Sequence, residues 1–91
     1  MASVKLYGGL VQVAGGEKTT EVYSITVSSI LDELISKYGD GFKNRILDSN
    51  GNPASFVRIF VNNKDIRFLK NLDTTVAEKD TIILMPAIGG G

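Results

Sequence analysis

The sequence predicts an α+β fold in which one amphipathic helix covers one face of a mixed β-sheet. Two observations indicate it. Segments of alternating or β-branched residues both precede and follow a single strong helical segment. The helical segment has one continuous apolar face, which needs one apolar sheet face opposite it. The chain has 91 residues, enough for a modest core, so we expect a single domain over residues 1–91.

Composition and charge exclude several classes of function. The chain is 43% hydrophobic and 22% charged, and its ten basic residues balance ten acidic ones. A net charge near zero gives no electrostatic case for nucleic acid or an anionic membrane as the main partner. Cysteine and histidine are absent, which excludes a disulfide framework, a zinc finger and a Ser–His or Cys–His catalytic pair. With neither a signal peptide nor a transmembrane run, we expect a cytoplasmic protein without membrane contact.

The first quarter of the chain predicts a β-hairpin. Residues 3–7 ("SVKLY") alternate between apolar and other side chains, which is typical of a half-buried strand. Gly8 and Gly9 break or bend that strand, and Gly15 and Gly16 mark a turn. Residues 19–25 ("TTEVYSI") are rich in β-branched and aromatic residues and predict the second strand.

The predicted helix spans residues 27–38. Its apolar residues fall on one helical face: Val27, Ile30, Leu31, Leu34, Ile35 and Tyr38. Thr26 is the preferred N-cap, although Ser28 or Ser29 could also serve, and Gly39 suits the position after the helix.

The second half predicts one helical turn and the remaining strands. In the connection of residues 39–55, Phe42, Ile46 and Leu47 indicate a short helical turn that packs on the core. Residues 56–61 and 81–85 predict strands, residues 62–65 a tight turn, residues 66–68 a short edge strand, and Pro86 the end of the last strand. With the first and last strands parallel and adjacent, this order gives a four- to five-stranded β-grasp, or ubiquitin-like, roll.

One face of the predicted sheet is more apolar than a solvated face should be. The inward set is Val4, Leu6, Val57, Ile59, Val61, Ile82 and Leu84. The outward set contains two basic residues and four apolar or aromatic ones: Lys5, Arg58, Tyr7, Phe60, Ile83 and Met85. Scattered surface apolarity would need no explanation. We favour a partner-docking patch, because these positions converge beside the end of the last strand.

The chain ends "PAIGGG", and we expect residues 86–91 to form a flexible tail. An inert end is one interpretation. A phosphate-binding loop or a linker would need further structure after the glycines. The other interpretation is that the terminal carboxylate is itself the functional group. Glycine suits that role, because a tail without side chains fits a narrow channel in a partner enzyme and leaves the acyl carbon open to attack. Ile88 can then anchor at the channel mouth.

The chain resembles the ubiquitin-like sulfur carriers of the MoaD/ThiS-like family over nearly its whole length. The resemblance is carried by "VN" at residues 61–62, L-D-T-x-V at residues 72–76, D-T-I-I-L at residues 80–84, and the ending. The family typically ends P-P-V-A-G-G or P-A-V-A-G-G. In this chain the six places are filled by Pro86, Ala87, Ile88, Gly89 in place of alanine, and the diglycine Gly90 and Gly91.

This resemblance implies that an E1-like adenylyltransferase (MoeB/ThiF-like) uses ATP and magnesium to adenylate the Gly91 carboxylate. Sulfur transfer then gives a Gly91 thiocarboxylate, while the rest of the tail threads into the partner: Pro86, Ala87, Ile88, Gly89 and Gly90. It implies no metal site, no permanently bound cofactor and no catalytic side chain in the carrier itself.

The branch we expect from the resemblance is the small subunit of molybdopterin synthase. Its sulfur acceptor would be the large subunit (MoaE-like), and the chain would be a monomer alone and a hetero-oligomer with its partner. Three alternatives stay open: a sulfur carrier for thiamine or cysteine biosynthesis, a modifier attached to lysines through Gly91, and a plain interaction domain with an inert tail.

Overall fold

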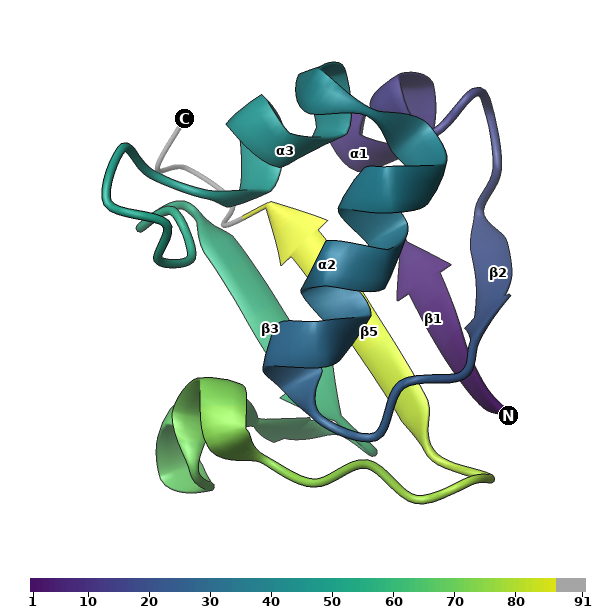
Figure 1. Cartoon of the computed structure of the whole chain (residues 1–91), viewed down its shortest axis with the longest axis vertical. Coiled ribbons are helices and arrows are strands. Elements are labelled where there is room, and N and C mark those ends of the chain that lie inside the picture. The colour runs from purple at the N-terminus through teal and green to yellow at the C-terminus, as the bar shows by residue number, and fades with distance from the viewer. Residues whose placement is uncertain (87–91) are drawn as a thin grey trace.

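The computed structural model describes residues 1–86, which form a five-stranded mixed sheet with the long helix α2 lying across one face (Figure 1). In chain order the elements are β1 (Ala2–Leu6), α1 (Gly9–Val13), β2 (Thr19–Val22), α2 (Val27–Tyr38), α3 (Asp40–Ile46), β3 (Val57–Val61), β4 (Lys64–Asp65), the 3₁₀ helices η1 (Ile66–Phe68) and η2 (Asn71–Asp73), and β5 (Thr81–Pro86). This is the predicted α+β β-grasp architecture.

The last strand lies at the centre of the sheet. The strand order is β2-β1-β5-β3-β4, with β1 and β5 parallel and the other neighbours antiparallel. Val4 pairs with Ile82 on one side of β5, and Ile59 pairs with Leu84 on the other. The whole predicted inward set is buried, which confirms the predicted alternation.

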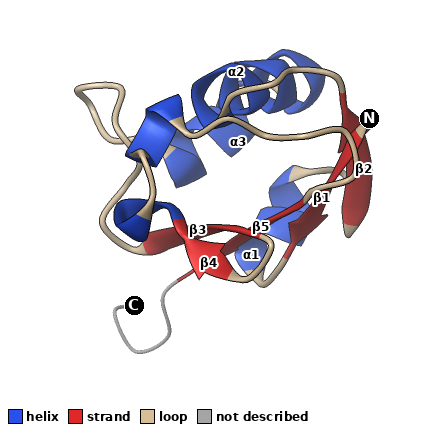
Figure 2. Cartoon of the chain, turned by 90° about the horizontal axis from the view of Figure 1, so that it is seen from below, coloured by secondary structure: helices blue, strands red, loops and turns tan. Residues whose placement is uncertain are grey.

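Helix α2 has the predicted bounds and caps. The Thr26 hydroxyl accepts a hydrogen bond from the Ser29 backbone N–H at 3.1 Å, and Gly39 follows the helix with φ 90°. Ile30 and Leu34 are almost completely buried against the sheet. Figure 2 shows the sheet nearly edge-on, with α2 and α3 on the same side of it.

The predicted helical turn is the two-turn helix α3. Phe42 is fully buried, and its ring centroid lies 5.1 Å from that of Tyr38 at the end of α2. The two short helices α1 and α3 lie together over the end of β5 at which the strand finishes (Figure 1).

The structure differs from the predicted elements at residues 9–13 and at residues 66–68. Residues 9–13 form the helix α1, which the glycine-flanked segment did not predict; its Leu10 is buried in the core. Residues 66–68 are a 3₁₀ helix and not an edge strand, and the edge strand is β4. The prediction failed because the two-residue turn at Asn62 and Asn63, both with positive φ, starts the edge strand directly at Lys64.

Strand β2 ends three residues earlier than predicted. The backbone N–H groups of Tyr23 and Ser24 donate to the carboxylate of Glu33 on α2, at 3.0–3.1 Å. Because a helix side chain takes these donors, the backbone leaves the sheet after Val22 and turns toward α2.

Candidate functional site

Pro86, which the sequence assigns to the predicted flexible tail, is part of a strand instead. Pro86 is the last residue of β5 and pairs with Val57 on β3, so it belongs to the sheet. A proline is tolerated there because its nitrogen faces the β1 side, where β1 has already ended at Leu6. The remaining predicted tail residues lie outside the described part of the chain: Ala87, Ile88, Gly89, Gly90 and Gly91.

Gly8 lies against Pro86 at the end of β5. Its backbone has φ 60° and ψ −139°, a conformation that residues with a side chain rarely adopt. A Cβ placed on Gly8 would lie only 2.8 Å from Cγ of Pro86. Gly8 is therefore required both by its own backbone and by the close approach of Pro86.

The six predicted docking residues share the outer face of the sheet, opposite α2. Register places Lys5 beside Ile83, and Ile83 beside Phe60, in one row across the three central strands. Arg58 and Met85 form the next row, and the N–H of Tyr7 donates to the Leu84 carbonyl at 3.2 Å next to Met85. We name the six residues the outer-face patch: Lys5, Tyr7, Arg58, Phe60, Ile83 and Met85.

The patch has an apolar centre and a basic margin. Phe60, Ile83 and Met85 are half-buried, while Lys5 and Arg58 are exposed. The Arg58 guanidinium lies 5.4 Å from the centroid of the Phe60 ring, close enough for a cation–π contact. This is the arrangement of a protein-docking surface; its use by a partner stays a prediction.

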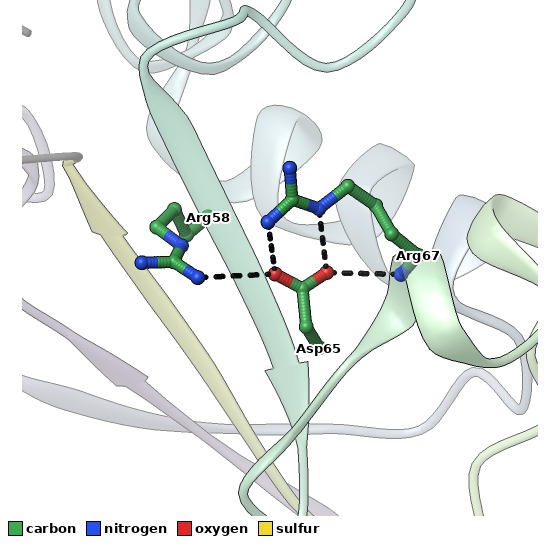
Figure 3. A network of polar contacts seen from close by, with 3 residues as sticks. All are labelled: Arg58, Asp65 and Arg67. Carbon is green, nitrogen blue, oxygen red and sulfur yellow. Dashed lines mark hydrogen bonds and ion pairs between the residues drawn. The ribbon is translucent and has the colours of Figure 1, made fainter.

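Arg58 is held in place by a carboxylate that the sequence did not single out (Figure 3). Asp65 is 6% exposed and receives two bonds from the Arg67 guanidinium, at 2.8 and 3.1 Å, and one from the Arg67 N–H. Arg58 approaches the same carboxylate at 3.6 Å from the opposite side. The sequence predicts only a tight turn at residues 62–65, whereas Asp65 is buried and caps η1.

The electrostatics of this cluster favour an ionised Asp65. The Arg67 guanidinium, its backbone N–H and the charge of Arg58 together hold the pKa of Asp65 below its usual range, although burial acts in the opposite sense. Two guanidinium groups therefore share one negative charge, and the cluster keeps a net positive charge beside the apolar centre.

Arg58 also borders an open groove along the outer edge of β3. The groove has a volume of about 650 Å³ and runs between residues 53–55, β3 and the 3₁₀ helices. Among residues 1–86, no three acidic side chains converge where they could hold a metal ion. No helix in this part of the chain is long and apolar enough to cross a membrane.

The sequence predicts which residues share the outer face of the sheet, but not the residues that support them. The pair Gly8–Gly9 signalled a break in the strand, but not that Pro86 passes over Gly8. Asp65 and Arg67 are two positions apart, a spacing that carries no signal outside a strand, and only the tight turn brings them to the sheet edge.

Comparisons with known proteins agree with this geometry. The model of the ThiS family matches residues 4–91. The sulfur carrier protein CysO of Mycobacterium tuberculosis is 34% identical over 79 residues, covering 85% of this chain and 84% of that protein. The crystal structure of the Amycolatopsis orientalis BexX/CysO complex contains a chain with a TM-score of 0.88 and 32% identity, with all of both chains covered. The small archaeal modifier protein 1 (SAMP1) of Methanosarcina acetivorans has a TM-score of 0.88 and 26% identity, covering 99% of this chain and 95% of that one.

Proposed function

The chain belongs to the ThiS family of ubiquitin-like sulfur carriers, and we propose that the terminal carboxylate of Gly91 is the group that carries the sulfur. The observation that carries the proposal is that the family match extends to Gly91, the last residue of the diglycine. The sheet supports it, because the central strand β5 runs toward the tail and its outward side chains belong to the outer-face patch.

The proposed chemistry takes place in a partner. An E1-like adenylyltransferase, with ATP and magnesium, lets the Gly91 carboxylate attack the α-phosphorus, and pyrophosphate leaves. A sulfur nucleophile then attacks the acyl carbon and displaces AMP, which leaves a thiocarboxylate. The carrier contributes recognition through its outer-face patch and an unobstructed terminus, since glycine adds no side chain at the reacting carbon.

As the first candidate for the sulfur acceptor we propose an enzyme of cysteine biosynthesis. The relatives reported above include proteins named CysO and none named as a molybdopterin synthase subunit. The molybdopterin synthase large subunit, which the sequence resemblance placed first, becomes the second candidate. Both acceptors would receive the same Gly91 thiocarboxylate, so the fold and the tail do not distinguish them.

A direct test uses the E1-like adenylyltransferase encoded in the same genome, with ATP, magnesium and a sulfide donor. We expect the intact mass to change by one sulfur in place of one oxygen, located in the C-terminal peptide. Deletion of Gly91 should abolish the change and leave the thermal unfolding temperature unaltered. Gly89→Ala, which restores the residue usual in the family, is the matched control and should charge normally. An unchanged mass under conditions that charge a related carrier contradicts the proposal.

The acceptor is tested by giving the thiocarboxylated protein separately to a cysteine synthase and to a molybdopterin synthase large subunit from the same genome. The enzyme that consumes the thiocarboxylate identifies the pathway.

The likeness to SAMP1 favours one second function, attachment to other proteins. In that case peptides of cellular proteins should contain lysines joined through an isopeptide bond to the Gly91 carbonyl. Mass spectrometry of conjugates purified from cells would detect them, and deletion of Gly91 should remove them.

A further inference from the structure

Arg45, at the end of α3, lies near the end of β5. A Cβ placed on Gly9 would be 2.9 Å from Nη1 of Arg45, so the guanidinium rests directly on the Gly9 backbone. The neighbouring Gly8 contacts Pro86 in the same way. These contacts and one Cα–Cα step place the guanidinium within roughly 13 Å of Pro86.

The missing side chain of Gly9 is what admits the guanidinium. Gly9 does not have the left-handed backbone of Gly8, so its own conformation does not require glycine. The space above Gly9 is instead filled by the end of the Arg45 side chain, which fixes the direction in which the charge points.

Within residues 1–86, Arg45 differs from the other two arginines in having no carboxylate within 4.0 Å. Arg58 and Arg67 share Asp65, and Lys37 pairs with Glu17. Arg45 is exposed, so its charge is available to a partner. On the opposite face of the sheet, Arg58 lies beside Met85, the residue before Pro86 at the same end of β5. The end of β5 is therefore flanked by positive charge on both faces, in a chain whose net charge is zero.

The length of the tail decides which anionic group Arg45 can reach. Five residues follow Pro86, and a fully extended segment of that length spans about 17 Å. When the tail threads into a channel, the Gly91 carboxylate and the ATP phosphates lie at the far end of that span. Arg45 stays at the near end, held on Gly9, so the group that it meets belongs to the surface of the partner around the channel mouth.

We propose that Arg45 is a specificity-determining residue that binds a carboxylate of the activating enzyme at the mouth of the channel that receives the tail. This inference rests on the proposed function. A guanidinium forms two parallel hydrogen bonds with a carboxylate, so the pair would fix the orientation of the carrier as well as attract it. Gly9 is the positioning residue that sets the guanidinium in place.

The test measures steady-state thiocarboxylation with the E1-like adenylyltransferase and compares Arg45→Glu with Lys43→Glu. Both residues are exposed cations in the last turn of α3, so the two variants change charge equally on the same helix. We expect Arg45→Glu to raise the KM for the carrier on the order of tenfold with kcat unchanged, and Lys43→Glu to stay within about twofold. The difference in KM between the two variants should shrink as the salt concentration rises from about 0.05 to 0.5 M.

Gly9→Ala tests the positioning without a change of charge. The added Cβ overlaps only the far end of a flexible side chain, so the fold should tolerate it while the guanidinium is displaced. We expect the KM to rise about threefold in the Arg45 protein and not to change further when combined with Arg45→Glu. Full additivity of the two substitutions would overturn the role of Gly9.

The result for Arg45→Glu shows which anionic group Arg45 binds. An unchanged KM overturns the proposal. A lower KM for the carrier would show that Arg45 holds the chain's own terminal carboxylate, and a raised KM for ATP would place it at the phosphates; either result also overturns it. The wild-type protein is measured first. If it is not charged at all, the proposed function fails, whereas normal charging of both wild type and Arg45→Glu refutes this inference alone.

Discussion

Gly8→Ala should unfold the protein more easily than any other single methyl addition at a described glycine. Two separate costs arise. An alanine at φ 60° and ψ −139° is strained by about 1–3 kcal/mol. Its methyl would also lie 2.8 Å from Cγ and 3.2 Å from Cδ of Pro86, and relieving such an overlap in a packed site costs a further 1–3 kcal/mol, roughly.

We therefore expect a loss of about 3 kcal/mol in the free energy of unfolding, since the two strains relax partly together. For a domain of this size the thermal midpoint then falls by more than about 10 °C. Urea unfolding followed by circular dichroism gives the free energy directly. The matched control is Gly41→Ala in α3, where φ is ordinary and nothing lies within 4 Å of the new methyl. That change should be neutral or stabilise by up to about 1 kcal/mol.

A second readout locates the strain. Because Pro86 must move to admit the methyl, the amide resonances of Met85 and Val57 should shift in Gly8→Ala and not in Gly41→Ala. A loss below about 0.5 kcal/mol together with unchanged resonances would refute the assignment of Gly8 as the residue that fixes the strand end.

Two further predictions concern a helix-to-strand contact and the outer-face patch. Burial alone would raise the pKa of Glu33. The N–H groups of Ser24 and Tyr23, the Ser24 hydroxyl and the charge of Lys37 together outweigh burial and hold the pKa below its ordinary value. The stability from this contact is therefore present above the unfolded pKa and is lost as pH falls through the folded one. In urea titrations, Glu33→Gln should thus have a lower free energy of unfolding than wild type at pH 7, and this difference should vanish below about pH 4. An equal difference at both pH values would argue against the contact. Phe60→Asp should weaken binding to the activating enzyme by about 2 kcal/mol, or roughly thirtyfold, in a titration calorimeter. Ser3→Asp, on the same face but outside the patch, should leave this binding unchanged. Equal losses of affinity in the two variants would contradict the role of the outer-face patch in docking.

The sequence predicts the parts of this fold that are fixed by repeated local signals. The apolar face of α2 recurs over three turns and is bounded by Thr26 and Gly39, so pattern and caps agree. The inward alternation of β1, β3 and β5 is equally regular. Helix α1 escaped prediction because one helical turn is too short to show a period, and its Leu10 is recognisable as a core residue only when the sheet is in place.

Residues 66–68 show the opposite failure. Their apolar and aromatic side chains favour a strand, but the Asp65 carboxylate accepts from the Arg67 N–H and starts a 3₁₀ turn there. Pro86 was predicted to end the last strand, and it does so as a member of the sheet, because its missing donor faces a position that β1 no longer occupies.

For the functional site, the sequence predicted the composition of the outer-face patch, because strict alternation assigns each strand residue to a face once the strand order is known. It could not predict the contacts of Gly8 with Pro86 or of Gly9 with Arg45. These contacts join positions more than 30 residues apart, and the local sequence around each glycine does not indicate its partner.

The central position of β5 has a mechanical consequence. Strand β5 is hydrogen-bonded to β1 on one side and to β3 on the other. A pull on the terminus along the strand axis therefore loads both ladders in shear, so that their bonds must break together and not one after another from an edge. A force applied at Pro86 therefore passes into a strand that is paired on both sides.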